Sequence, residues 1–425
     1  MTGIAVELAK DNTSRPLLSI IIPTYNRQEY AASAIRCTLE IPSNDIEIVV
    51  QDCSDDDLLS SMIVPELLDK RLSYRYDRPP VNMTENWNRA ITLARGEYVC
   101  LIGDDDGVNP EIVQAAVWAK STGLDCLAVR NTVNYLWTGT GAPSGLFEKA
   151  VGGCLKIAGF RDNITEVDTE VELRKLVRDG GVYYLQFNLP KLYHGLVHRR
   201  CLEAIHEKVG AYCGGLSPDI FPSVAIACVA RRVAVTDYPL TIPGASKASG
   251  SVMEGMVKKH SNRLEDAPHF RHRGEYHWSE LVPRVYTPEA IWADSGVAAL
   301  LAMGRVDLVQ QLNLPRLAAF CFRANRRVTS RVLQDLLAGL RMTGKSPLIG
   351  ILAFAGSLVV EYSLRFARRV RNRLLIMIAA RRIDTIRDVT NMVEGAHALS
   401  QYLEEHGWAF AQCTLQGRPG ALKKR

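Results

Sequence analysis

The chain reads Tyr98-Val99-Cys100-Leu101-Ile102-Gly103-Asp104-Asp105-Asp106 at the point that decides its fold. An apolar run stops there at three consecutive carboxylates, which is the pattern of a buried strand that ends in an acidic turn. Ligands of open α/β sheets bind at the carboxyl ends of the strands, so this turn is a candidate binding site. Alternate residues of an extended segment face the same side, so we expect Asp104 and Asp106 to meet a hard divalent ion together while Asp105 points elsewhere. The alternative is a solvated acidic turn ahead of a helix that begins near Asn109-Pro110-Glu111.

Two apolar runs upstream repeat this pattern of a buried strand followed by polar residues. Residues 17–22 precede Thr24-Tyr25-Asn26-Arg27, and residues 46–50 end at a polar stretch that runs from Gln51 to Asp57. Asn26 and Glu29 have the spacing of a capping box, which predicts that a helix starts there. Strand and helix alternate at the spacing of βαβ units, which indicates an α/β fold with a mostly parallel sheet. The expected elements are strands over 17–22, 46–50 and 72–76, and helices over 26–40 and 84–94.

Four segments, in this order, resemble the family 2 inverting glycosyltransferases of GT-A fold. They are Ser19 to Arg27, Val49 to Ser54, Asn86 to Tyr98 and Gly103 to Asp106. The resemblance covers residues 15 to about 125 well and weakens towards residue 245. It implies a Rossmann-like, mostly parallel sheet with flanking helices. This chain departs from many relatives at Gln51 and Gly103, where they carry an acid.

The resemblance also implies roles for single residues. Asp52, in the Asp-x-Ser turn after the second strand, would recognise the nucleotide base, usually uracil, and Tyr25 would stack near it. Asp104 and Asp105 would hold the ribose and sugar hydroxyls, and Asp106, together with Asp104, would hold Mn²⁺ or Mg²⁺ on the diphosphate. A carboxylate accepts the imide and hydroxyl protons of uridine, and the ion offsets the charge of the departing diphosphate. The expected nucleotide-sugar residues are Pro23, Thr24, Tyr25, Asp52, Asn86, Asp104 and Asp105, and the expected metal ligands are Asp106 and Asp104.

A catalytic base is expected further along the chain. An inverting transfer is a single in-line displacement, so one carboxylate must take the proton of the attacking hydroxyl. In the family this residue lies well downstream of the metal motif, often as an Asp ahead of a helix. Asp219, in Gly215-Leu216-Ser217-Pro218-Asp219-Ile220, fits that position and is the candidate base. The alternative is that Asp219 only caps the apolar helix expected over 220–229.

Other polar residues are candidates for contact with the donor or the acceptor. His194 and Arg199 lie near the ends of an expected strand, and a satisfied core histidine is the alternative for His194. Lys247, in a segment rich in Gly and Ser, could meet a diphosphate or lie in a plain linker. Residues 139–159 are expected to form a loop near the acceptor. A group of histidines has no zinc spacing, although one member could complete the shell of the catalytic ion: His260, His269, His272 and His277.

From about Thr287 the apolar residues recur at helical spacing. Residues 347–360 form an apolar stretch of fourteen, too short to span a bilayer of about 30 Å, which needs about twenty residues. An Arg-rich helix follows, and the pair suits peripheral contact of residues 347–382 with the anionic inner face of a membrane. The alternative is a buried helix hairpin with a solvated Arg face. Helices are expected over 290–303, 306–312, 332–340 and 383–402.

We expect three parts in the chain. A GT-A glycosyltransferase domain covers residues 1–245, with a nucleotide-sugar half over 15–106 and an acceptor half over 107–245. Residues 246–286 form a flexible linker or lid, and residues 287–425 form a mainly helical, basic region.

The net charge of +5 is distributed unevenly over the 425 residues. Residues 341–425 hold fourteen Lys and Arg against six Asp and Glu, but no nucleic-acid motif accompanies them, so we expect no nucleic-acid partner. The ten cysteines lack paired spacing, and residues 1–16 lack an apolar signal core. Both observations favour a protein of the reducing cytoplasm, either free or peripheral on the inner face of the membrane.

Together these patterns predict a metal-dependent, inverting glycosyltransferase. Its donor would be a nucleotide sugar, UDP-linked by expectation, and its acceptor a hydroxyl of a surface polysaccharide or lipid-linked glycan. A sugar-nucleotide nucleotidyltransferase is one alternative, but the Gly-rich basic loop expected after its first strand is replaced by Pro23-Thr24-Tyr25-Asn26. A catalytically inactive GT-A scaffold at the membrane is the other.

Overall fold

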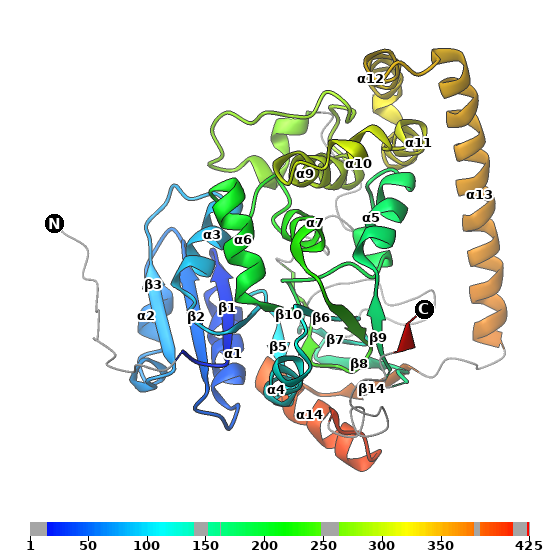
Figure 1. Ribbon diagram of the computed structural model, residues 1–425. Helices are drawn as coiled ribbons and strands as arrows, with labels where there is room; N and C mark the ends of the chain where they lie inside the picture. Colours follow the sequence, from blue (N-terminus) through cyan, green and yellow to red (C-terminus); the bar gives the residue numbers. More distant parts are fainter. Residues whose placement is uncertain are drawn as a thin grey trace.

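The computed structural model describes residues 15–139, 152–161, 163–247, 263–377, 383–410 and 423–424. His260 and most of the predicted loop over 139–159 lie outside the described residues. Figure 1 gives the labels of the helices and strands.

A nine-stranded mixed sheet forms the centre of the protein (Figure 1). Its strands lie in the order β15-β9-β11-β6-β10-β4-β1-β2-β3. Strands β3, β2, β1 and β4 are parallel neighbours, whereas β10 runs antiparallel between β4 and β6. The strands predicted over 17–22, 46–50 and 72–76 are confirmed as β1, β2 and β3. The bounds are β1 Leu18–Thr24, β2 Ile46–Asp52, β3 Leu72–Tyr76, β4 Tyr98–Leu101, β6 Cys126–Val129, β9 Ile164–Val167, β10 Gly195–His198, β11 Val233–Thr236 and β15 Lys423–Lys424.

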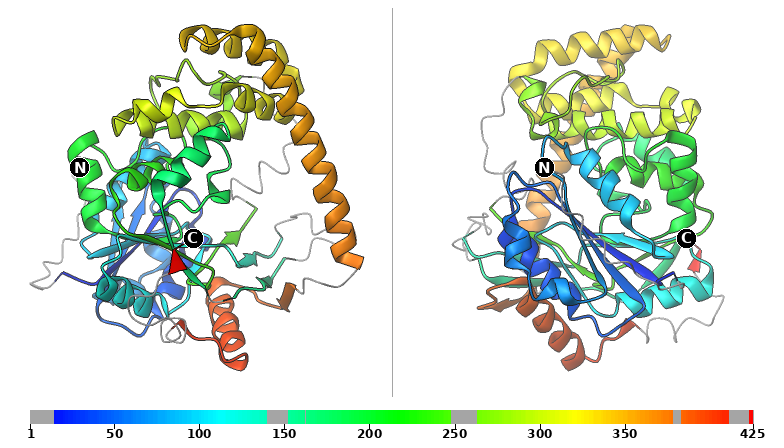
Figure 2. Two further views of the ribbon diagram at one scale, coloured as in Figure 1. Left: turned by 45° about the vertical axis from the view of Figure 1, so that its right-hand side comes forward. Right: turned by 90° about the vertical axis from the view of Figure 1, so that its left-hand side faces the viewer.

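Hydrophobic cores lie on both faces of this sheet. Ile21 of β1 joins one core, whereas Ile20 and Ile22 join the other, because successive side chains of a strand point to opposite faces. Helices α3, α5, α6 and α7 cover the first face, and α1, α4 and α14 cover the second (Figure 1, Figure 2). A largely parallel sheet covered on both faces is the predicted α/β architecture. The bounds are α1 Gln28–Leu39, α2 Leu58–Met62, α3 Met83–Leu93, α4 Ile112–Thr122, α5 Thr169–Arg178, α6 Arg199–Val209 and α7 Ile220–Val229.

Short strands bring a distant segment next to the acidic turn. Directly after the turn, β5 (Gly107–Val108) pairs with β12 (Thr241–Ile242). The chain then continues into β13 (Gly244–Ala245), which pairs with β7 (Val133–Leu136). A side chain at Gly244 would place its Cβ 1.8 Å from the carbonyl oxygen of Asp105, so only glycine permits this approach.

The C-terminal region is mainly helical, as predicted, but it is not separate from the rest. Helices α9 to α12 contribute to the same core as α5 and α7. After α13 the chain returns to the other side of the protein, where β14 pairs with β8 and α14 packs on α1 (Figure 1). The bounds are α9 Pro288–Ala302, α10 Val306–Gln310, α11 Leu314–Ala324, α12 Thr329–Met342, α13 Pro347–Met377, β8 Cys154–Ala158, β14 Ile383–Arg387 and α14 Met392–Glu405.

Three local predictions were wrong. Residues 383–387 form β14 and not the start of a helix, because their β-branched residues pair with β8. The apolar and Arg-rich stretches from residue 347 form one continuous helix of 31 residues and not a hairpin. Asn26 adopts a left-handed φ of +53° and hydrogen-bonds Asp55 rather than capping α1, a conformation that Asn tolerates.

Candidate active site

The carboxyl ends of β1, β2 and β4 bring the predicted residues to one edge of the sheet. Thr24 ends β1, and its hydroxyl donates to Asp104 Oδ2 at 2.8 Å, although 80 positions separate the two residues. Asp52 ends β2, and the acidic turn follows β4. Pro23 is buried within β1 opposite Gln51, so it contributes to the strand and not to an open surface.

An arginine compensates two of the three acids. The terminal nitrogens of Arg27 lie 2.7 Å from Asp104 Oδ1 and 2.5 Å from Asp105 Oδ2. Ser246 accepts a hydrogen bond from Arg27 at 2.6 Å and donates one to Asp105 Oδ2 at 2.8 Å. The planar fork of a guanidinium suits two adjacent carboxylates. Arg27 therefore ties the acidic turn both to β1 and to the segment after β13.

Asp106 is buried and accepts hydrogen bonds at both carboxylate oxygens. Its Oδ1 accepts the backbone N–H of Gly244 at 2.7 Å, and its Oδ2 accepts the hydroxyl of Tyr193 at 2.7 Å. Oδ2 also accepts the N–H of Gly103 at 2.6 Å and lies 3.2 Å from His194 Nε2. Burial alone would raise the pKa of Asp106, but His194 and these donors lower it below its ordinary value. Asp106 is therefore a carboxylate at neutral pH.

The prediction that Asp104 and Asp106 face one side while Asp105 points elsewhere is wrong. Asp104 and Asp105 both contact Arg27, whereas Asp106 contacts other donors. The reason is that residues 104–105 form a turn and not an extended segment, with the N–H of Asp106 donating to the carbonyl of Gly103 at 3.2 Å. Within the part of the chain that the structure describes, no group of three or more His, Cys, Asp or Glu side chains is arranged to hold a metal ion.

The acidic turn nevertheless has the chemistry of a cation site. Asp104 and Asp105 share one guanidinium, so their charge is compensated only in part. Burial raises the pKa of Asp104 to about 7 against the lowering effect of Arg27. Burial and the neighbouring Asp106 raise the pKa of Asp105. Carboxylate oxygens are the ligands that Mg²⁺ and Mn²⁺ prefer, so the donor set fits a hard divalent ion.

The structure leaves little room for a side chain at position 103, where the family resemblance leads one to expect an acid. A Cβ at Gly103 would lie 2.7 Å from Asp106 Oδ2 and 3.1 Å from the hydroxyl of Tyr193. The hydrogen bond between Tyr193 and Asp106 takes up that space. An acid at position 103 would also add a fourth negative charge beside a single arginine.

Asp52, the residue predicted to recognise the base, is fully buried. Its Oδ1 accepts the backbone N–H of Ser54 at 2.8 Å, and its Oδ2 accepts the hydroxyl of Tyr74 at 2.9 Å. Burial raises the pKa of Asp52, and hydrogen bonds from Ser54 and Tyr74 oppose this effect. Because Asp52 is fully buried, a nucleotide base can reach it only if the side chains that cover it move. Tyr74, on β3, was not among the predicted site residues.

Tyr25 and Asn86 differ in what they offer to a nucleotide. Tyr25 is half-buried, its hydroxyl donates to Asp55, and the guanidinium of Arg271 lies 5.2 Å from the centre of its ring. Arg271 thus covers a ring that was predicted to stack near the base. Asn86 is buried and donates to the carbonyl of Thr24 at 3.0 Å, so it positions the end of β1.

The described part of the predicted linker or lid, residues 263–286, packs over this edge of the protein. Arg273 Nη1 donates to the hydroxyl of Thr84 at 2.6 Å, and that hydroxyl lies 3.2 Å from the carbonyl of Gly215. Trp278 belongs to the core that also contains α7 and α9. This segment therefore joins the nucleotide side of the site to the loop that precedes Asp219.

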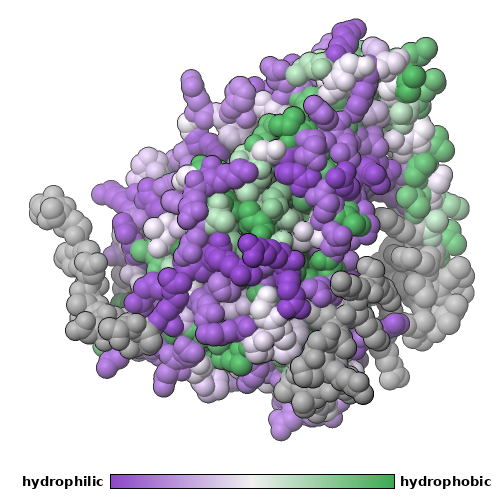
Figure 3. Space-filling view, in the orientation of Figure 1, coloured by the Kyte–Doolittle hydropathy of each residue, from purple (hydrophilic) through white to green (hydrophobic). Residues whose placement is uncertain are grey.

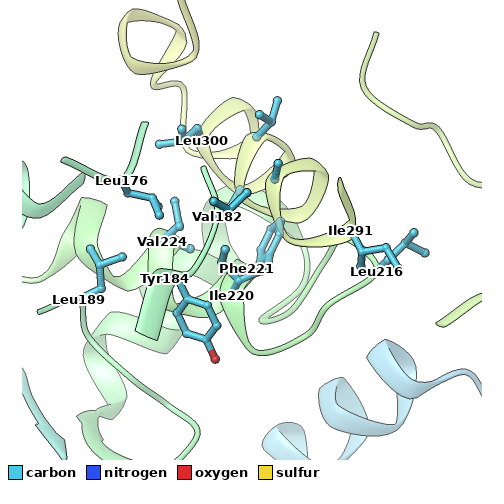
Figure 4. Close-up of a cluster of buried hydrophobic side chains, with 14 of the residues drawn as sticks. Leu176, Val182, Tyr184, Leu189, Leu216, Ile220, Phe221, Val224, Ile291 and Leu300 are labelled. Carbon is cyan, nitrogen blue, oxygen red and sulfur yellow. The ribbon is translucent and has the colours of Figure 1, made fainter. Parts of the chain in front are cut away.

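Asp219 lies just before α7, but its side chain makes no capping hydrogen bond, so the predicted alternative role as a helix cap is wrong. Its Oδ2 accepts the hydroxyl of Tyr184 at 2.6 Å, and its Oδ1 accepts that of Ser217 at 2.5 Å. The ring of Tyr184 lies among apolar side chains, with its hydroxyl directed out of that cluster (Figure 4). Tyr193, which donates to Asp106, is a separate buried tyrosine, and burial and Asp106 raise its pKa.

The remaining candidates divide into buried and exposed residues. His194 is 4% exposed, adopts a left-handed φ of +60°, and has no hydrogen-bond partner at Nδ1 among the described residues. Arg199 is buried and donates to the carbonyl of Gly96 at 2.7 Å, which is a structural contact away from the turn. Lys247 is exposed. Within the described part of the chain, none of the later candidate histidines contacts the acidic turn: His269, His272 and His277.

The fold and the acidic turn at the end of β4 define a GT-A domain. Residues 19–134 match the sequence profile of Glycosyl transferase family 2.

Parts of the chain are also similar to individual proteins. The chain is 38% identical over 98 residues to the "Putative colanic acid biosynthesis glycosyl transferase WcaA" of Escherichia coli (strain K12), which is 23% of this chain and 35% of that protein. It is 35% identical over 96 residues to the "GalNAc(5)-diNAcBac-PP-undecaprenol beta-1,3-glucosyltransferase" of Campylobacter jejuni, or 21% of this chain and 30% of that protein. The chain thus spans about a third of the length of these relatives. A crystal structure of S. aureus TarS 1-349 in complex with UDP-GlcNAc has 16% identity and a TM-score of 0.40, and covers 83% of this chain and 92% of that one.

Proposed function

We propose that the chain is an inverting glycosyltransferase that moves a sugar from a UDP-linked donor to a hydroxyl of a glycan or lipid-linked acceptor. The observation that carries the proposal is the buried acidic turn after β4, which lies at the same edge of the sheet as Thr24 and Asp52 at the ends of β1 and β2. The family match over residues 19–134 and the names of the relatives support this class of reaction.

Asp219 would take the proton of the attacking hydroxyl. Two hydroxyls already donate to its carboxylate, so this side chain is held by Tyr184 and Ser217 and does not bond the N–H groups at the start of α7. Tyr184 and Ser217 would orient it, because a general base must lie within hydrogen-bond reach of the proton that it accepts. Asp106 and Asp104 would hold Mn²⁺ or Mg²⁺, which when bound offsets the charge of the diphosphate leaving group.

Equilibrium binding of nucleotides tests this proposal. Calorimetry with UDP, GDP and ADP, each with and without Mn²⁺, should show binding of one nucleotide diphosphate that is strengthened by the ion. UDP is the expected nucleotide. If none of the three binds under either condition, the proposal is wrong.

Arg27 provides a test of the cation site that does not depend on turnover. Because its guanidinium occupies the acids, we expect Mn²⁺ alone to change the melting temperature of the native protein little. Arg27→Met should lower the stability by about 3–5 kcal/mol, since it leaves buried carboxylates unpaired. Mn²⁺ should then restore several degrees of the lost melting temperature, as measured by differential scanning calorimetry.

The control is Arg36→Met. Arg36 pairs with Glu66, and the side chain of Arg36 is 46% exposed. Its melting temperature should change little, with or without the ion. Equal stabilisation of the native protein, Arg27→Met and Arg36→Met by Mn²⁺ would refute competition between Arg27 and a metal.

We further propose that α13 lies on an anionic membrane surface, at the inner face of the cytoplasmic membrane. Its segment Pro347–Ala367 is long and apolar enough to cross a membrane by length and composition, and only 17% of the apolar window is buried. One face of the helix docks on α11, where Glu361 pairs with Arg323 at 2.8 Å and Arg316 at 3.2 Å. These buried pairs fix the helix to the folded body, which favours a helix that lies on a membrane over one that spans it.

The outward face of α13 supports the lipid partner. Figure 3 shows apolar residues along the edge of the protein where this helix lies. The chain continues from this face into the Arg-rich end of the helix, and such a combination suits acyl chains and anionic headgroups together. The exposed apolar side chains are Leu348, Ile349, Leu352, Val359, Val360, Leu364 and Phe366.

Substitutions on this face should release the protein from vesicles. Leu352→Ser with Val359→Ser should weaken binding to vesicles that contain phosphatidylglycerol at least about tenfold, because each side chain contributes roughly 1.5–3 kcal/mol when it leaves water. Flotation assays measure the bound fraction. The matched control is Val64→Ser with Leu68→Ser, two side chains that are 57% and 84% exposed on another surface. Equal loss in both variants, or no binding of the native protein, would rule out a membrane contact through α13.

A further inference from the structure

A cavity of about 510 Å³ lies at the acceptor half of the sheet, beyond the carboxyl ends of β6 and β11. Its polar lining includes Arg130, Asn131, Gln186, Asn188 and Lys191. The family resemblance assigns none of these residues a role. The cavity has the size of a small-molecule site, since such sites measure roughly 300–1,000 Å³.

Two cations line this cavity without an acid. Lys191 is only 9% exposed, and its ammonium group donates to the carbonyl of Val129 at 2.8 Å. Arg130 donates to the side-chain oxygen of Asn188 at 2.8 Å. Among the described residues, no carboxylate lies within ion-pair distance of Lys191 or Arg130. Burial lowers the pKa of Lys191 to about 8; Cys126 partly opposes this effect, and Arg130 adds to it.

A buried ammonium without a counterion is costly. Proteins pair such a charge, neutralise it, or use it to bind an anion. A purely structural lysine would extend its charged end into open water. Lys191 instead places it at the wall of a cavity, beside a second cation.

One wall of the cavity is continuous in sequence with Tyr184, a hydrogen-bond partner of the proposed catalytic base. This wall includes residues 185–189, which directly follow Tyr184 in the chain. The hydroxyl of Tyr184 donates to Asp219 at 2.6 Å. Among the described residues that line the cavity, none belongs to the acidic turn that is proposed for the donor.

We infer that this cavity binds an anionic group of the acceptor, a phosphate or a carboxylate, through Lys191 and Arg130. That the ligand belongs to the acceptor rests on the proposed function, whereas the anion site itself does not. Asn131 and Asn188 supply polar groups for the neighbouring hydroxyls of a phosphorylated or acidic sugar.

Calorimetry with glycerol 1-phosphate, galacturonate and glycerol tests the inference, at saturating UDP and without UDP. The native protein should bind at least one of the anions and not glycerol, and UDP should not compete. Arg130→Gln, at an exposed position, should weaken anion binding about tenfold, and Lys191→Met should weaken it more. Tighter binding of glycerol 1-phosphate indicates a phosphate acceptor, and tighter binding of galacturonate indicates a carboxylate.

The stability of Lys191→Met separates a binding site from a structural lysine. Removal of an unpaired buried charge should leave the melting temperature equal or higher at pH 7. Lys120→Met is the control, because Lys120 pairs with Glu97 and lies outside the cavity. Unchanged anion binding in Lys191→Met and Arg130→Gln, or competition by UDP, would overturn the inference. If the native protein binds an anion but not UDP, the assignment of UDP as the donor nucleotide is wrong and the anion site still stands.

Discussion

Asp219→Asn is expected to lower the turnover number about 10²–10⁴-fold while UDP binds with unchanged affinity. The amide has the size of the carboxylate and keeps an oxygen that accepts a hydrogen bond from Tyr184 or Ser217. It cannot take the proton of the attacking hydroxyl. Steady-state kinetics and calorimetry on one sample separate the two effects.

Asp168→Asn is the matched control for this substitution. Asp168 caps α5 by accepting the N–H groups of Glu170 and Val171, a role that Asn also fills. Its turnover should equal that of the native protein. If Asp219→Asn keeps more than a tenth of the native turnover, another group is the base.

Asp106→Asn is expected to abolish Mn²⁺-dependent nucleotide binding, with a loss of affinity of at least about a hundredfold. The folded protein should also lose about 1–3 kcal/mol of unfolding free energy, because the amide N–H₂ would face N–H and O–H donors. Those donors are the N–H groups of Gly103 and Gly244 and the hydroxyl of Tyr193. Calorimetry with UDP and Mn²⁺, and urea unfolding, measure the two effects.

An exposed acid near the same edge controls for the loss of charge. Asp57→Asn removes an exposed carboxylate that accepts a long hydrogen bond, 3.3 Å, from the hydroxyl of Tyr74. UDP affinity and stability should change little in this variant. Native affinity for UDP and Mn²⁺ in Asp106→Asn would show that the acidic turn does not hold the ion.

The ends of the strands were predictable from sequence. The apolar residues of each run are the buried part of a strand, so the first polar residues mark where the strand ends. β1, β2, β3 and β4 all lie where these runs indicated. Parallel pairing then places Thr24, Asp52 and the acidic turn at one edge, which the alternation of strands and helices implies.

Contacts between distant segments could not be predicted in this way. Arg27 follows β1, and nothing in its neighbourhood indicates that it pairs with two acids far along the chain. Ser246 joins the same group only because β12 and β13 bring the chain back to the acidic turn. Tyr74 on Asp52 and Tyr184 on Asp219 are likewise tertiary contacts.

Local rules failed where tertiary contacts outweighed them. Asn26 has capping-box spacing, yet its side chain donates a hydrogen bond to Asp55 and does not cap α1. The residues around Asp219 are typical of a helix cap. The carboxylate of Asp219 instead accepts hydrogen bonds from the hydroxyls of Tyr184 and Ser217. Both exceptions lie at the candidate active site, where local preference and function are expected to conflict.

The most direct test of the central claim is the release of UDP from a panel of UDP-sugars by the native protein with Mn²⁺, compared with Asp106→Asn and Asp219→Asn. The native protein should hydrolyse one UDP-sugar slowly without an acceptor. Both variants should hydrolyse it much more slowly. Hydrolysis of no sugar by the native protein, or equal hydrolysis by all three, would contradict the central claim, and would leave a GT-A domain without transferase activity at this site.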